Sequence, residues 1–255
     1  MTMKTATDMR LLFSRLFFQY LRNPMFIIVN LTTPILYLVL FMPLLKKLSG
    51  PGFNSSHVVQ IFLPGIISLL FAMAGLFSVW PTIFELKDGL IERFRVTPAS
   101  RFALLIGPIL MWNAWTLISS AVIVVISLAF GFHVHIVGLL LFAILLVLLL
   151  TLFEAWVTAI AIIMKGEITS ISGVVTGLNL PILLTAGVML PLSLAPGWIR
   201  VLAHFNPLYY VVDAGRQLSA GSLATFQVGV GFGVLVPLTA LVLWWSTRVY
   251  QKAIS

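Results

Sequence analysis

Charge is scarce in this sequence. Of the 255 residues, 9% are charged and 60% are hydrophobic, and the mean hydropathy is +1.11. A soluble domain carries about 25% charged residues. So little charge cannot cover a water-facing surface, so most of the surface must face lipid or other apolar helices. The sequence therefore predicts an integral membrane protein.

Cysteine is absent altogether, which excludes disulfides, thiolate metal sites and a cysteine nucleophile. The G-x-x-x-x-G-K-[ST] phosphate loop and the protease signatures H-E-x-x-H and G-x-S-x-G are absent too. We therefore expect no enzyme, no cofactor and no metal in this chain, and ATP hydrolysis would need a partner. His133 and His135, one residue apart, are a weak metal signal.

Six apolar segments are long enough to cross the hydrocarbon core, which needs about 20 residues. They are residues 24–45, 58–84, 102–130, 136–164, 168–190 and 226–246. Two lysines, rather than a small-residue cleavage site, close the first run, so it is interpreted as a retained span. Kinks are predicted at Pro34, Pro64, Pro108 and Pro181. The fold class is an all-α membrane protein with six transmembrane helices in a single transmembrane domain, residues 1–255.

The basic residues set the predicted orientation. With the N-terminus inside, eleven of the fifteen Lys and Arg residues fall on the cytoplasmic side, and the other four are Lys46, Lys47, Arg200 and Arg216. Such a bias marks the cytoplasmic face, so both termini are predicted to be cytoplasmic. The net charge of +8 is then explained without nucleic acid, which is not expected as a partner.

Residues 8–22 show apolar side chains at spacings of three and four, with polar ones on the opposite face. The apolar positions are Met9, Leu12, Phe13, Leu16, Phe17 and Tyr20; the polar face includes Arg10, Arg15, Gln19 and Arg22. This pattern predicts an amphipathic helix in the membrane interface, although a frayed tail has the same composition.

Two further segments stand outside the spans. Residues 85–101 form the densest charged stretch of the chain, which suits either a short cytoplasmic helix that docks on a partner or a solvated loop. Residues 191–222 are too polar to span and too apolar for a free loop. They are predicted to be two short helices that re-enter from outside, broken at Asn206-Pro207 because a residue before proline disfavours helical geometry. On the second helix, Asp213 and Arg216 would share a face and could pair.

Glu154 is the one acidic residue deep within a predicted span. A carboxylate at mid-membrane costs about 2.5 kcal/mol or more, so it needs a partner, a proton or a wet cavity. One interpretation is a contact with cargo or a proton. The other is a hydrogen bond between helices, to Thr151, Thr158, Asn113 or Trp112.

Three stretches carry a family resemblance. They are Arg22-Asn23-Pro24 after the amphipathic helix, Gly89-Leu90-Ile91-Glu92-Arg93 followed by Thr97-Pro98, and Asn206-Pro207-Leu208-Tyr209-Tyr210 followed by Val211-Val212-Asp213-Ala214-Gly215-Arg216. In this order around six spans, they resemble the permease (transmembrane) subunit of the type-2 ABC transporters, most closely the drug-resistance and nodulation-factor export branch.

The resemblance implies three groups of functional residues. Coupling to the ATPase would use Glu85, Lys87, Asp88, Gly89, Glu92 and Arg93. A connecting helix would use Arg10, Arg15, Gln19 and Arg22. The outer re-entrant signature would be Asn206, Pro207, Tyr209, Tyr210, Asp213 and Arg216.

The resemblance also implies partners and a location. Two permease chains, expected to be identical, would pair above two copies of a separate ABC ATPase, which holds ATP and Mg²⁺. They would export a hydrophobic or amphiphilic cargo across a bacterial or archaeal plasma membrane. A secondary transporter or channel, or a non-transporting assembly subunit, is the alternative. A channel or secondary transporter would need inverted repeats or several ionisable residues at mid-depth, and Glu154 stands alone there.

Overall fold

The computed structural model describes residues 2–25, 55–87, 101–188 and 195–254, together with residues 28, 32, 35, 36, 39, 40 and 192. Within these residues the regular structure is helical. The long helices are α1 (Thr2–Leu21), α3 (Ser55–Phe77), α6 (Arg101–Leu128), α7 (Ile136–Ile163), α8 (Ile168–Thr185) and α11 (Phe226–Ile254). The shorter ones are α4 (Val79–Lys87), α9 (Gly197–Ala203) and α10 (Pro207–Ser219).

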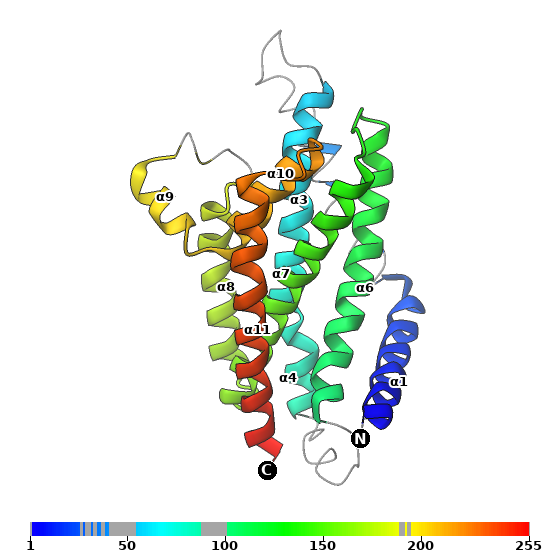
Figure 1. Ribbon diagram of the computed structural model, residues 1–255. Coiled ribbons are helices and arrows are strands. Elements are labelled where there is room, and N and C mark those ends of the chain that lie inside the picture. The colour runs from blue at the N-terminus through cyan, green and yellow to red at the C-terminus, as the bar shows by residue number, and fades with distance from the viewer. Residues whose placement is uncertain are drawn as a thin grey trace.

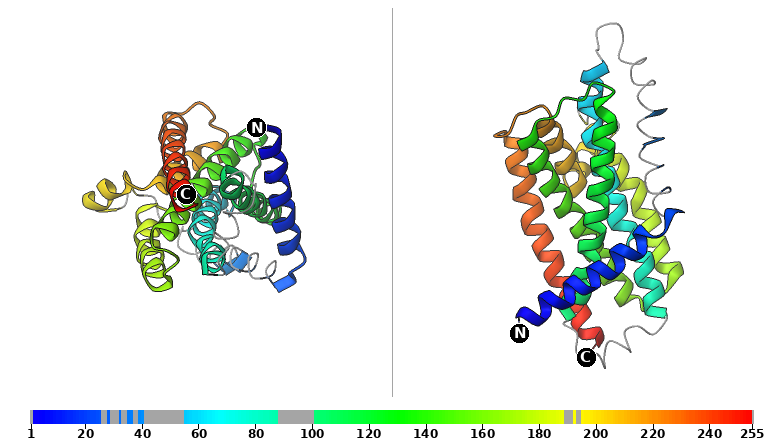
Figure 2. Two further views of the ribbon diagram at one scale, coloured as in Figure 1. Left: turned by 90° about the horizontal axis from the view of Figure 1, so that it is seen from below. Right: turned by 90° about the vertical axis from the view of Figure 1, so that its right-hand side faces the viewer.

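The long helices form a bundle whose two ends differ. The start of α1, the end of α4 and the end of α11 lie at one end, and α9 and α10 lie at the other (Figure 1). We call these the terminal end and the cap end. Helix α1 crosses the outside of the bundle obliquely near the terminal end, and α9 projects sideways from the cap end (Figure 2).

Among the described residues, five regions are long and apolar enough to cross a membrane: Val59–Phe84, Ile106–Leu128, Ile136–Ile163, Ile168–Thr185 and Phe226–Lys252. They correspond to five of the six predicted spans. The sixth, residues 24–45, lies almost wholly outside the described residues. Two helix ends differ from the prediction by more than three residues. Helix α8 ends at Thr185 rather than at residue 190, because Gly187 adopts a φ of 67°, the left-handed conformation that commonly ends helices. Helix α11 continues eight residues beyond the prediction, and Arg248 lies over the Trp244 ring at 5.3 Å.

The predicted span 58–84 is not one straight helix. It is divided at Ser78 into α3 and α4. Pro81 accounts for the break, because it has no N–H to donate to the carbonyl of Phe77 and its ring crowds that carbonyl. Ser78 itself remains bonded to α3: its N–H donates to the Ala74 carbonyl at 3.0 Å and its hydroxyl to the Gly75 carbonyl at 2.7 Å. The last two turns before the charged segment can therefore take a direction different from that of α3.

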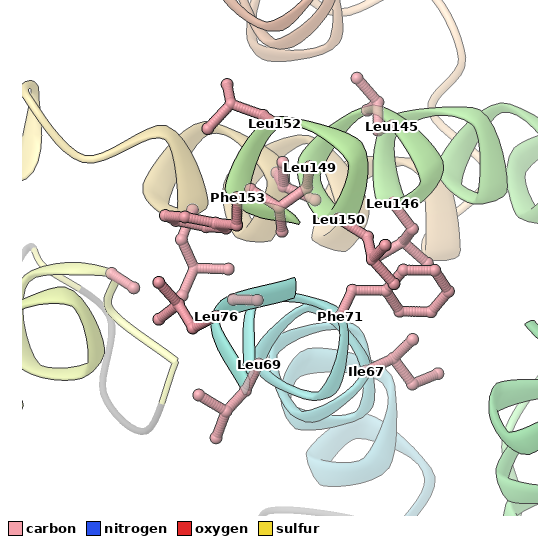
Figure 3. Packing of buried hydrophobic residues seen from close by; sticks show 14 of the residues in the cluster. Ile67, Leu69, Phe71, Leu76, Leu145, Leu146, Leu149, Leu150, Leu152 and Phe153 are labelled. Atoms are coloured by element: carbon pink, nitrogen blue, oxygen red, sulfur yellow. The ribbon is translucent and has the colours of Figure 1, made fainter. Parts of the chain in front are cut away.

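The core of the bundle is the contact between α3 and α7 (Figure 3). Helix α7 is central, since α3, α4, α6, α8, α10 and α11 all pack on it. Gly75 permits the closest approach: a Cβ at this position would lie 2.8 Å from Phe153 Cβ and 2.9 Å from the Leu150 carbonyl oxygen. Leucines and phenylalanines of both helices fill the rest of the contact, among them Phe71, Leu76, Leu149 and Leu150.

Candidate functional site

The side chain of Asn206 bonds the turn between α9 and α10 to two helices. Its Oδ1 accepts from the backbone N–H of Leu208 at 3.0 Å, which caps α10, and Pro207 takes the first position of that helix. Its Nδ2 donates to the Ile182 carbonyl at 2.7 Å and to Thr185 Oγ1 at 2.9 Å. The predicted break is thus present, and it is also tied to the last turn of α8.

Arg216 joins α10 to two other parts of the cap end. Its Nε donates to the Ile61 carbonyl of α3 at 3.2 Å, and its Nη2 donates to the carbonyls of Gly187 at 2.7 Å and Val188 at 3.4 Å. The direct pairing with Asp213 that the sequence suggested is not among these bonds. Asp213 still influences Arg216 electrostatically. Burial lowers the pKa of the Arg216 guanidinium, and the nearby Asp213 carboxylate opposes that shift.

A cavity of about 180 Å³ lies between the end of α8 and α10. Its described lining residues are Ala186, Gly187, Leu192, Tyr209, Val212, Asp213 and Arg216. Burial raises the pKa of Asp213, and the charge of Arg216 partly counteracts this. Burial also raises the pKa of Tyr209. The nearby Asp213 and Tyr210 raise this pKa further, and the charge of Arg216 lowers it. The cavity therefore combines opposite charges with a phenol in partly dehydrated surroundings.

Two tyrosines connect the end of α9 to the start of α10. The Tyr210 hydroxyl donates to the His204 carbonyl at 2.9 Å. The rings of Tyr209 and Tyr210 lie 5.2 Å apart, and that of Tyr209 is 5.6 Å from His204. The six residues of the predicted outer signature thus surround the α9–α10 turn and the cavity.

Gln60 is a cap-end residue that sequence reasoning missed. Its Nε2 donates to the carbonyls of His133, at 3.0 Å, and of Ser219, and its Oε1 accepts from the His133 N–H at 3.2 Å. One amide therefore joins α3, the turn between α6 and α7, and the end of α10. The sequence feature that could have indicated this role is a single glutamine at the start of an apolar run. His133 bonds to Gln60 through its backbone N–H and carbonyl. No group of three metal-ligating side chains occurs in the described part of the chain.

Glu154 lies on α7 and is buried, with 3% of its surface exposed. The described residues offer no hydrogen-bond partner to its Oε2. Two of the partners considered from sequence bond to each other instead, since Asn113 Nδ2 donates to Thr151 Oγ1 at 3.1 Å. The Asn113 Oδ1 is also enclosed without a described partner. The expected bond from these residues to Glu154 Oε2 is thus not seen.

Helix α1 turns its apolar face to the protein. All six predicted apolar positions are partly covered, and Arg10, Arg15, Gln19 and Arg22 are exposed. The rings of Tyr20 and Trp112 lie 5.7 Å apart, and those of Phe17 and Trp115 lie 6.4 Å apart. This face packs on α6, and the location of the helix in the membrane interface stays a prediction. The opposite face carries a shallow groove along Leu11, Ser14, Arg15, Phe18, Gln19 and Arg22.

The predicted coupling segment is described only at its start. Glu85 and Lys87 belong to the last turn of α4, which points to the terminal end. Asp88, Gly89, Glu92 and Arg93 lie outside the described residues, so their arrangement stays a prediction.

Comparisons with known proteins agree on one family. The family model described as ABC-2 type transporter matches residues 7–219. The putative transport permease ycf38 of Cyanophora paradoxa is 26% identical over 245 residues, which cover 90% of this chain and 83% of the relative. The daunorubicin resistance ABC transporter permease protein DrrB1 of Streptomyces coeruleorubidus is 24% identical over 231 residues, or 88% and 80% of the two chains. The probable doxorubicin resistance ABC transporter permease protein DrrC of Mycobacterium tuberculosis is 26% identical over 234 residues, or 91% and 80%.

Proposed function

Because this chain belongs to the ABC-2 type transporter family, we propose that it is the membrane-spanning permease of an ATP-driven exporter. The family match, which extends from α1 to the end of α10, is the observation that carries this proposal. Two relatives with drug-resistance names favour a hydrophobic or amphiphilic cargo, such as a drug, an antibiotic or a lipid-linked or glycolipid molecule.

The energy for export comes from a separate ABC ATPase, which binds ATP and Mg²⁺, because the sequence has no phosphate loop. Two copies of the ATPase bind at the terminal end, which carries α1 and the start of the coupling segment. Glu85, Lys87, Asp88, Gly89, Glu92 and Arg93 provide the main contact. Helix α1, on which Arg10, Arg15, Gln19 and Arg22 are exposed, packs beside the ATPase as a second contact.

A second copy of the chain completes the permease. Helix α8 supports this: of its eighteen residues 11% are buried, compared with 61% of the most apolar part of Val59–Phe84. Helix α9 and the turn after it are also uncovered: Trp198 and Val201 of α9 are 66% and 61% exposed, and Phe205 of the turn is 82% exposed. The cargo passes between the two copies, and the cap end lies outside the cell. The protein resides in a bacterial or archaeal plasma membrane with both termini cytoplasmic, as its charge distribution favours.

Reconstitution tests this function. The chain is co-expressed with a stand-alone ABC ATPase and placed in liposomes, and ATP-dependent movement of a panel of labelled amphiphiles is measured. Transport should require the permease, the ATPase and ATP together. Cargo movement that is independent of ATP, or that is driven by an ion gradient alone, would favour a secondary transporter or channel instead.

A double charge reversal, Glu92→Arg with Arg93→Glu, tests the coupling segment. The variant should insert and bind lipid normally, but it should lose the link between ATP hydrolysis and transport. A matched pair of reversals, Glu167→Lys with Lys165→Glu, exchanges charges in the turn between α7 and α8 and serves as control. If the Glu92/Arg93 variant retains the ATPase and transports at the wild-type rate, this segment is not the contact.

A further inference from the structure

The cavity at the cap end contains hydrogen-bond donors and acceptors that have no partner within the described residues. A guanidinium has five N–H donors, and Arg216 uses those on Nε and Nη2. The two N–H groups on its Nη1 make no hydrogen bond within the described part of the chain, and neither does the Asp213 carboxylate. Both side chains line the cavity, one helical turn apart.

The level of the cavity in the membrane follows from the length of α8. Its 18 residues span about 27 Å at 1.5 Å per residue, close to the roughly 30 Å hydrocarbon core. Gly187, two residues past its end, lines the cavity. The charged groups therefore lie at the level of the lipid headgroups. Tyr209, which also lines it, is a residue type enriched at that level.

The size of the cavity limits what can bind. Pockets for drug-sized molecules measure about 300–1,000 Å³, so 180 Å³ holds a headgroup rather than a whole amphiphile. Hydrophobic tails would remain outside, where the last two turns of α8 expose Leu180 at 62% and Leu184 at 63%.

We propose that this cavity binds the headgroup of an ethanolamine phospholipid from the membrane leaflet at the cap end. The phosphate accepts hydrogen bonds from Arg216 Nη1, and the ammonium donates to the Asp213 carboxylate. A purely anionic headgroup would meet Asp213 as a repulsive neighbour. A choline headgroup has the positive charge but no N–H to donate. The site thus distinguishes headgroups by charge and by donor, and it is independent of whether the protein exports anything.

The test uses the full-length protein in nanodiscs with equal amounts of ethanolamine, glycerol and choline phospholipids of identical chains. Native mass spectrometry of the released protein counts retained lipids. The ethanolamine lipid should be enriched about tenfold over the other two, the effect of one charge-assisted hydrogen bond. The Asp213→Asn variant removes the charge and nearly keeps the shape, so it should lose most of the enrichment over the glycerol lipid.

Glu167→Gln, the same chemical change at the opposite end of α8, is the control and should retain the preference. Equal retention of the three lipids by the wild type would overturn the proposal, and so would an Asp213→Asn variant with undiminished preference. Soluble phosphoethanolamine distinguishes a lipid from a free compound. Displacement of the lipid by micromolar phosphoethanolamine would show that the site takes free headgroups, and resistance at that concentration supports the lipid.

Discussion

Asn206 allows the tie between α8 and the α9–α10 turn to be separated from the capping of α10. Its Oδ1 serves the cap, and its Nδ2 serves Ile182 and Thr185. An Asn206→Ala variant loses both functions. An Asn206→Asp variant keeps an excellent capping oxygen but loses the two donated bonds, so the two variants together measure the tie.

The expected costs follow from these three bonds. Loss of an N-cap costs about 1 kcal/mol, and each lost hydrogen bond costs about 1 kcal/mol, so Asn206→Ala should destabilise the protein by roughly 3 kcal/mol. Asn206→Asp loses about 2 kcal/mol with the donated bonds. It also places an anion beside the Ile182 carbonyl at the negative end of the α8 dipole, which adds about 0.3–1 kcal/mol. Aspartate should therefore be nearly as harmful as alanine.

Unfolding of the purified protein in a titration with denaturing detergent, followed by circular dichroism, measures these differences. Thr185→Val removes the hydroxyl that accepts from Asn206 while it keeps the side-chain shape. A double-mutant cycle between Asn206→Ala and Thr185→Val should give a coupling of about 0.5–1.5 kcal/mol. An Asn206→Asp variant as stable as wild type, or a coupling near zero, would refute the tie to α8.

Three further predictions concern other parts of the chain. Gly75→Ala should be less stable than Gly177→Ala by about 1–3 kcal/mol in the same titration, because both gain helix propensity but only Gly75 would overpack against α7. In the native protein, burial raises the pKa of Asp213, so the folded state holds its proton more tightly than the unfolded state. The stability should therefore fall as the pH rises from the ordinary aspartate range through that raised pKa, and Asp213→Asn should remove this part of the pH dependence. Glu154→Leu should leave the stability unchanged or raise it by about 1–3 kcal/mol, because it removes an enclosed acceptor without a described partner. Retained transport by Glu154→Gln would argue against a cargo contact that needs the charge, and a large loss of stability in Glu154→Leu would mean that the carboxyl holds helices together.

Features with a local cause were the ones that the sequence could predict. The apolar face of α1 follows from spacings of three and four, and the same six positions are partly covered in the structure. The break before α10 follows from the restriction that Pro207 places on Asn206. Five of the predicted spans have counterparts because their apolar runs exceed the thickness of the hydrocarbon core.

The effect of a proline on a helix is not predicted by local sequence rules alone. Pro64, Pro108 and Pro181 lie inside continuous helices, but α3 and α4 are separated one turn before Pro81. Near Pro64, Arg216 of a distant helix donates to the carbonyl of Ile61. Such donors come from tertiary structure, so the sequence alone does not tell a bend from a break.

The polar contacts of the cap end were beyond sequence reasoning for a similar reason. Gln60 bonds to residues 73 and 159 positions away in the chain. Hydropathy and periodicity carry no information about such pairs. The sequence could suggest Asn206 and Arg216 as important, but not that they serve α8 and α3. It also suggested Asp213 as the partner of Arg216, and backbone carbonyls take that place instead.

The distribution of these contacts has a mechanical consequence. At the cap end, Gln60, Asn206 and Arg216 each bond to two or more separate parts of the chain. Towards the terminal end, the second span is interrupted at Ser78, and the short α4 continues it to the charged segment. A displacement that begins in the charged segment would therefore meet less resistance at the α3–α4 break than within a continuous helix, because Pro81 has no N–H to donate to the Phe77 carbonyl. The bond from the Ser78 N–H to the Ala74 carbonyl, at 3.0 Å, still joins the break to α3. The cap end, where these three side chains join α3, α8, α10 and the α6–α7 turn, would move as one unit. An ATPase that binds at the end of α4 would thus act on the bundle through this break, and the tie between α8 and the α9–α10 turn would carry the movement to the cavity at the cap end.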